Sequence, residues 1–68
     1  MKVILSCPDC GKIPTILNLN GVYITDTGSR NASCFCNLYR DLAKSERIAR
    51  YMWNRAVLER IDYERKKQ

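Results

Sequence analysis

The sequence contains no histidine and no long apolar run. Without an imidazole, neither a Ser-His-Asp set nor a Cys-His set can be built, and no glycine-rich phosphate loop is present, so we expect the protein not to be an enzyme. No segment approaches the roughly 20 apolar residues of a membrane-spanning helix. The N-terminus has one lysine and a three-residue apolar run, which is too little for a signal peptide. These absences predict a cytoplasmic protein without a membrane partner.

Four cysteines are present in two local pairs: Cys7 and Cys10 with two residues between them, and Cys34 and Cys36 with one. A 68-residue chain needs a staple for its small core, and thiols in a reducing cytoplasm bind metal more often than they form disulfides. The 23 residues between the pairs suit a zinc ribbon, so we predict one structural Zn²⁺ on all four thiolates. Such a closed site leaves no position for a reactive water.

The second cysteine pair departs from the usual ribbon spacing. With only Phe35 between them, Cys34 and Cys36 should lie on the same side of an extended strand and share the metal after a local twist. Two alternatives therefore stay open: a three-cysteine site with one spectator, and free thiols without metal.

Positive charge is in modest excess, with 12 Lys and Arg against seven Asp and Glu and a formal charge of +5. Four thiolates outweigh one Zn²⁺ by two negative charges, which lowers the charge of the loaded protein to about +3. This is a mild basic bias rather than the dense basic patch of a dedicated nucleic-acid binder. In a nucleic-acid interface, the phosphate contacts would come from Lys12, Arg30, Arg40, Arg47, Arg50 and the tail Arg65-Lys66-Lys67.

Residues 1–44 are expected to form the β part of a small α+β zinc ribbon. Asn20-Gly21 between two alternating segments, residues 15–19 and 22–26, predicts a type I′ hairpin, because both turn positions favour positive φ. The packed face of the hairpin should carry the apolar residues Leu17, Leu19, Val22 and Ile24. A further short strand over residues 3–7 should lead into the first cysteine turn, giving three short antiparallel strands.

Residues 45–68 are expected to form one long C-terminal helix and a basic tail within the same single domain. The segment contains neither Gly nor Pro, Ser45 is a suitable N-cap, and the helix should run to about Glu64. At 100° per residue, the stripe that should face the ribbon comprises Ile48, Met52, Ala56 and Tyr63, with Ala49 and Trp53 on its edge. The apolar residues on another side are Val57, Leu58 and Ile61. This second side is a self-association seam, a contact for a target protein, or simply an exposed helix end.

Asp26-Thr27-Gly28-Ser29 is locally similar to the active-site loop of retroviral-type aspartic proteases. Such proteases need a longer and nearly all-β chain, whereas this one ends in a helix. A turn that requires Asp and Gly accounts for the same residues.

Two stretches together resemble a known family. The segment Cys7-Pro8-Asp9-Cys10-Gly11-Lys12 opens the chain, and Ala49, Trp53 and Asn54 lie on the helix with the spacing Ala-x₃-Trp-Asn. Over residues 5–55 the chain resembles the Lar-like restriction-alleviation proteins, small zinc ribbons of phages and prophages. It departs from them where the family has a second Cys-x₂-Cys-Gly knuckle and a later arginine, since Ala56 stands in place of that arginine.

The resemblance implies a phage or prophage accessory protein in the host cytoplasm, which binds and inhibits or modulates a host protein, with restriction alleviation as the family's activity. The surface for a host or phage protein, or for a second copy in a homodimer, is expected to comprise Arg47, Arg50, Asn54, Val57, Leu58 and Ile61. The alternative is a nucleic-acid-binding zinc ribbon such as a small transcriptional regulator. Protein binding is favoured because the charge excess is small once the metal is counted.

Overall fold

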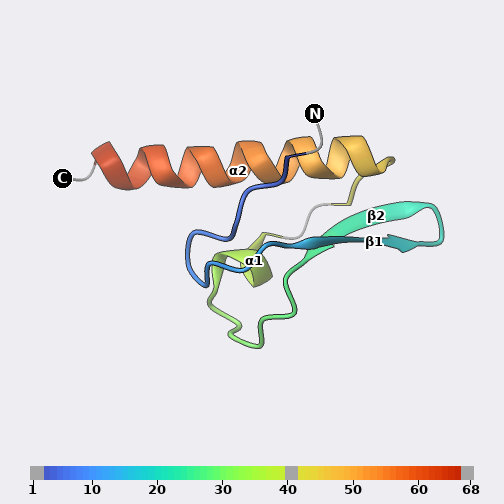
Figure 1. Cartoon of the computed structure of the whole chain (residues 1–68), viewed down its shortest axis with the longest axis horizontal. Helices are drawn as coiled ribbons and strands as arrows, with labels where there is room; N and C mark the ends of the chain where they lie inside the picture. Colours follow the sequence, from blue (N-terminus) through green and yellow to red (C-terminus); the bar gives the residue numbers. More distant parts are fainter. Residues whose placement is uncertain (1–2, 40–41, 67–68) are drawn as a thin grey trace.

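The computed structural model describes residues 3–39 and 42–66 and shows a small α+β protein (Figure 1). Its elements follow in the order β1 (Thr15–Leu19), β2 (Val22–Asp26), α1 (Phe35–Leu38) and α2 (Glu46–Lys66). Helix α2 lies along one side of the molecule, and the hairpin and α1 lie beneath it. The predicted combination of a hairpin and a long C-terminal helix is confirmed. None of the helices in the described ranges has the length and apolarity that crossing a membrane requires.

Strands β1 and β2 form the predicted antiparallel hairpin, in which Leu19 pairs with Val22 across a two-residue turn. Asn20 and Gly21 have φ values of 55° and 88°. Both values lie in the left-handed region that a type I′ turn requires, so the turn chemistry of the sequence sets the register of the two strands.

The predicted packed face of the hairpin is wrong. Leu17 and Leu19 are exposed, whereas Thr25, on the opposite face, is buried. The tip of the hairpin projects beyond the rest of the molecule (Figure 1), and Leu19 beside the turn is exposed. Ile16 and Tyr23, which share the face of Thr25, are half-buried, so this face is the more covered one.

The prediction of three strands is also corrected, because the described residues contain only two. Residues 3–7 do not pair with a strand, and α2 side chains bind the backbone of Val3 and Leu5 instead. Strand β2 gains a second neighbour at one point, where Tyr23 and Ala43 form an isolated antiparallel bridge with N–H···O distances of 2.8 and 2.9 Å.

Helix α2 begins as predicted, since the Ser45 hydroxyl accepts a hydrogen bond of 3.2 Å from the Ile48 N–H. Its inward face differs from the prediction. Ile48 and Tyr63 are exposed, and the buried residues of α2 are Ala49, Trp53 and Val57. These three residues are four positions apart and therefore share one face, with the largest side chain at its centre.

The core is built around Trp53, whose side chain is fully buried. It packs with Val57 and with the cysteine cluster. The rings of Phe35 and Tyr39 are stacked with centroids 5.7 Å apart, and each meets Trp53 edge to face, at 5.4 and 6.0 Å. Edge-to-face aromatic contacts add to the apolar area that such rings remove from water, so this trio joins α1 firmly to α2.

Candidate metal centre

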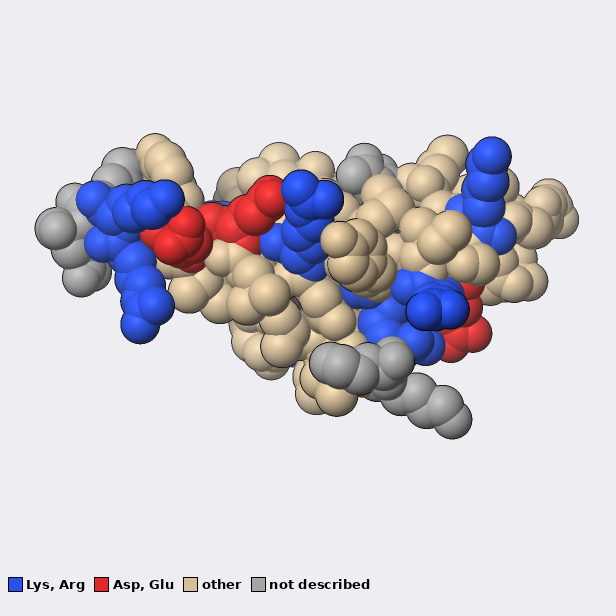
Figure 2. All heavy atoms as spheres, turned by 90° about the horizontal axis from the view of Figure 1, so that it is seen from above, with Lys and Arg blue, Asp and Glu red and all other residues tan. Residues whose placement is uncertain are grey.

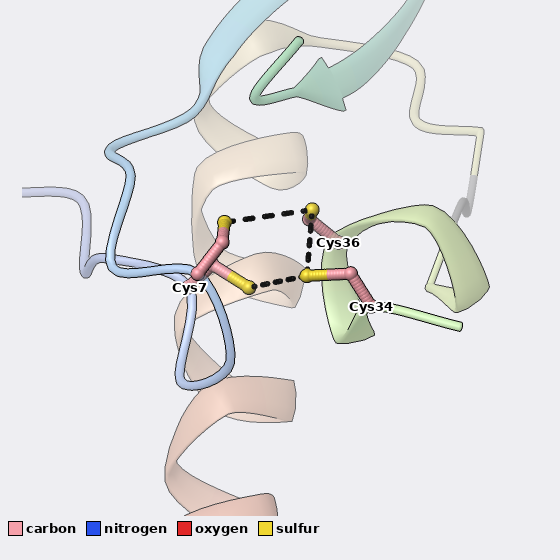
Figure 3. Close-up of side chains that lie close together, drawn as sticks. Cys7, Cys34 and Cys36 are labelled. Carbon is pink, nitrogen blue, oxygen red and sulfur yellow. Dashed lines mark hydrogen bonds between the residues drawn. The ribbon is translucent and has the colours of Figure 1, made fainter. Parts of the chain in front are cut away.

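The sulfur atoms of all four cysteines converge within 4.8 Å of one another (Figure 3). The Sγ–Sγ distances are 3.5 Å between Cys7 and Cys34, 3.3 Å between Cys34 and Cys36, and 3.9 Å between Cys10 and Cys36. Four ligands at a Zn–S length of about 2.3 Å would lie about 3.8 Å apart in a tetrahedron. All four cysteines are free of disulfides. The cluster can therefore hold one metal ion on four thiolates.

The first pair of cysteines is positioned by a tight turn. The Cys7 N–H donates to the Lys12 carbonyl and the Gly11 N–H donates to the Cys7 carbonyl, both at 2.9 Å. Gly11 has a φ of 76°, which a residue with a side chain rarely adopts. The chain folds back within this turn, and both Cys7 and Cys10 reach the cluster.

The second pair does not lie on an extended strand, as the sequence analysis expected. Cys34 is the N-cap residue of α1, and Cys36 lies inside that single turn of helix. The N–H groups of Asn37 and Leu38 donate to the Cys34 carbonyl at 2.9 and 3.0 Å. The helical turn brings the two sulfurs to 3.3 Å with only one residue between them, so the short spacing is compatible with full ligation.

Two polar side chains support the second pair. The Thr27 hydroxyl donates a hydrogen bond of 2.9 Å to Cys36 Sγ. Asp9, which lies between the first two cysteines, accepts a hydrogen bond of 2.8 Å from the Phe35 N–H through Oδ2. Its other oxygen accepts from Arg60 on α2 at 3.0 Å. A single carboxylate thus joins both cysteine turns to the long helix.

Arg60 is held in place from three sides. Besides Asp9, it contacts Glu64 through Nε at 2.9 Å, and its guanidinium lies over the Phe35 ring, 5.9 Å from the centroid. The hydrogen bond that Arg60 donates to Glu64 and the negative charge of Asp9 raise the pKa of Arg60 above its usual value. The side chain is therefore a permanent cation at the junction of the cluster and α2.

The pKa values of the Cys7 and Cys34 thiols are shifted in opposite directions. Burial raises the pKa of the Cys7 thiol, but backbone hydrogen bonds from Cys10 and Asp9, together with the thiols of Cys34 and Cys10, lower the pKa to about 7. A backbone hydrogen bond from Cys36 lowers the pKa of Cys34, but burial and the adjacent thiols raise it to about 12. Cys34 therefore holds its proton more strongly than Cys7 does. A metal cation must displace the thiol protons of the cluster when it binds.

Trp53 and Asn54, the helix residues of the family-like pattern, bind the N-terminal segment. Trp53 Nε1–H donates to the Leu5 carbonyl at 2.8 Å. The Asn54 amide accepts from the Leu5 N–H and donates to the Val3 carbonyl, both at 2.8 Å. These three hydrogen bonds occupy the backbone donor and acceptors of Val3 and Leu5 that a neighbouring β-strand would otherwise bind. Residues 3–7 therefore form no strand.

An open groove of about 800 Å³ lies between this N-terminal segment and α2. The predicted partner residues that line it are Arg47, Arg50, Asn54 and Leu58. Ile61 is exposed but lies outside the groove. Val57 is buried in the core, so its predicted place on an exposed surface is wrong. The cause is its position one turn after Trp53, on the face that the indole turns inward.

Sequence reasoning did not identify Asp9, Thr27 and Arg60. The position of Asp9 between Cys7 and Cys10 was a local indication of a role, because a carboxylate in a tight turn can accept hydrogen bonds from nearby N–H groups. Thr27 and Arg60 carried none, because their partners are nine and 51 positions away. The segment that contains Thr27 forms a turn, in which the Gly28 N–H donates to the Asp26 carboxylate at 3.2 Å.

No protein-family model matches the chain, and comparisons with curated proteins and with solved structures find no match.

Proposed function

We propose that the four thiolates hold one Zn²⁺ and that its role is structural. A ligand set of sulfur alone favours zinc over calcium or magnesium, which prefer oxygen. Four thiolates fill the tetrahedral positions, so the ion contributes folding energy and activates no water. The residues of the chain then have simple roles: the cysteines bind the ion, Thr27 orients Cys36, and Asp9 with Arg60 attaches the site to α2.

With the fold held together by this zinc site, the protein acts by binding, as a phage or prophage accessory protein that inhibits or modulates a host protein in the host cytoplasm. The resemblance to the Lar-like family indicates restriction as the host process. The observation that carries the binding role is the groove, where Tyr51 and Leu58 are 63% and 58% exposed beside charged side chains. Grouped apolar side chains on a rigid helix are typical of protein contacts.

The charges on α2 support a protein partner over a nucleic acid. Basic side chains of α2 pair with acidic ones a turn away, in the pairs Arg50–Glu46, Arg55–Glu59, Arg60–Glu64 and Lys66–Asp62. Figure 2, which views the molecule from above, shows blue and red groups interleaved along this side. A phosphate backbone laid along the helix would meet four acidic side chains among the six basic ones of α2. Arg40 and Lys67, predicted as phosphate contacts, lie outside the described residues.

The test is a restriction assay with matched variants. Expression of the chain in a restricting host should raise the plating efficiency of unmodified phage. Leu58→Glu, in the groove, should abolish this effect, whereas Ile48→Glu, on an exposed part of α2 outside the groove, should retain it. A folded, zinc-loaded chain that leaves plating unchanged would contradict the restriction role.

Duplex DNA provides the test of the second candidate, a small transcriptional regulator, which the overall positive charge favours. Tight binding that falls steeply with salt and is lost in the double variant Arg47→Glu with Arg50→Glu would support a nucleic-acid-binding protein. We expect weak binding that these two substitutions leave unchanged.

A further inference from the structure

The groove beside α2 has side chains of opposite charge at its two ends. Its end toward the start of α2 carries Arg47, its opposite end carries Asp62, and the exposed side chains of Tyr51 and Leu58 lie between. A partner that fits this order must present an acidic end, an apolar middle and a basic end. The same helix, turned end over end, presents that order.

We infer that the groove binds a second copy of this chain, with the two α2 helices antiparallel about a two-fold axis. The inference rests on the proposed function, in which the groove binds a protein surface. In the purified protein, where no host protein is present, that surface is the groove of a second copy. A two-fold axis repeats each contact, so every favourable pair is formed twice.

The residue numbers place the two-fold axis. Each helical residue rises about 1.5 Å, so in an antiparallel pair two residues lie at the same height when their numbers add to a constant. An axis between Asn54 and Arg55 sets Arg47 of one copy level with Asp62 of the other, and Tyr51 level with Leu58. The same axis sets Arg50 level with Glu59, another acidic residue of the groove.

The residues beside this axis are compatible with close approach. Val3 is 58% exposed, and its carbonyl is bound by Asn54, so its side chain lies next to the axis and adds apolar area to the contact. Arg55 is paired with Glu59 on its own helix at 3.3 Å, so the same carboxylate lies near Arg55 and level with Arg50 of the other copy and reduces the repulsion between the two copies of Arg55. A parallel pair would instead set each Arg47 against its own copy, so the charges select the antiparallel arrangement.

Sedimentation equilibrium of the zinc-loaded full chain tests the inference. We expect a mass twice that of the 7.9 kDa chain. Arg47→Asp alone, or Asp62→Arg alone, sets like charges together at both ends of the contact and should raise the dimer dissociation constant about tenfold or more. The double variant Arg47→Asp with Asp62→Arg exchanges the two ends and should restore the dimer. Leu58→Glu should give a monomer, whereas Ile48→Glu should leave the dimer intact.

Circular dichroism and zinc content, measured on each variant, separate loss of the contact from loss of the fold. A monomer at every concentration, or a dimer that the exchange of charges neither weakens nor restores, would overturn the inference. A monomeric chain that still raises plating efficiency through Leu58 would also overturn it, while leaving the protein-binding role intact. A dimer that follows the charge exchange but does not affect restriction would support the inference and contradict only the host role.

Discussion

Asn54 binds the backbone of Leu5, 49 positions away in the sequence, through a hydrogen bond of 2.8 Å. The same side chain donates to the Val3 carbonyl. An amide side chain carries one acceptor and a donor group, as a peptide group does, so Asn54 acts on this segment like one residue of an adjacent strand. The N-terminal segment is therefore fastened to α2 and not to the hairpin.

Replacing Asn54 by Ala should release this segment. The change leaves the partly buried Leu5 N–H without its partner, while water can replace Asn54 at the exposed Val3 carbonyl, so the free energy of unfolding should fall by about 1 kcal/mol. Hydrogen exchange at the Leu5 amide should become about tenfold faster or more, because its local opening becomes easier. Urea unfolding and amide exchange measure the two effects.

The matched control is Arg55→Ala at the next, exposed position, which should change stability by less than about 0.5 kcal/mol. Equal protection of the Leu5 amide in the Asn54→Ala variant and the parent would contradict the strand-like role.

Those parts of the fold that depend on neighbouring residues could be predicted from the sequence. Asn20-Gly21 needs positive φ at both positions, and Ser45 precedes a segment without helix breakers, so the hairpin and the start of α2 follow from local chemistry. Which face turns inward depends on what lies opposite. Thr25 is buried and Leu17 is exposed because they lie on opposite faces of the hairpin, and no local pattern shows which of the two faces is covered.

The candidate site divides in the same way. The spacing of the cysteines indicated the four ligands, yet the turn of helix that unites Cys34 and Cys36 was not expected. That turn depends on the Asp9 carboxylate, which binds the Phe35 N–H from a distant part of the chain. Trp53 was predicted at the edge of the stripe that faces the ribbon, but its bond to Leu5 requires the N-terminal segment to be in place. Long-range polar contacts of this kind leave no periodic trace in the sequence.

Metal removal should unfold the protein. Without the ion, three buried thiols and a small aromatic core must hold the chain together, which is too little for a domain of 68 residues. A chelator should abolish most of the helical circular dichroism and shift the Trp53 emission to the red, and one equivalent of Zn²⁺ should restore both. Native mass spectrometry should find one zinc per chain.

Alkylation of the loaded protein distinguishes the modes of ligation. Four protected thiols are expected, including the exposed Cys10. One reactive thiol beside a bound zinc would establish the three-cysteine alternative, and a chain that keeps its helical signal in chelator would contradict a structural role for the metal.

Thr27 should increase metal affinity without touching the metal. Its hydroxyl donates to Cys36 Sγ at 2.9 Å, and such a bond stabilises the thiolate and fixes its direction. Thr27→Val keeps the shape of the side chain but loses the donor to Cys36, and with it the acceptor that the Ser29 N–H binds at 3.2 Å, so zinc affinity should fall about tenfold. Competition with a chelating dye measures the change. Thr15→Val is the matched control, because the Thr15 hydroxyl bonds only a carbonyl of the hairpin; an equal loss in both variants would show that Thr27 acts through the fold and not through the thiolate.

Asp9 and Arg60 should be coupled more strongly than the exposed pair Arg55–Glu59. The Asp9 and Arg60 side chains are 31% and 32% exposed, whereas those of Arg55 and Glu59 are 67% and 69% exposed. Ion pairs weaken as water screens them, so a double-mutant cycle should give a measurable favourable coupling for the first pair and one close to zero for the second.

The cycle uses Asp9→Asn, which keeps an acceptor for the Phe35 N–H, and Arg60→Gln, with urea unfolding of the zinc-loaded protein as the measurement. The coupling should fall only partly at high salt, since both side chains are partly shielded from solvent. Equal couplings for the two pairs would mean that Asp9–Arg60 is an ordinary surface pair. In that case the helix would be held over the metal centre by the packing of Trp53 and Val57 and by the hydrogen bonds of Trp53 and Asn54 to the N-terminal segment.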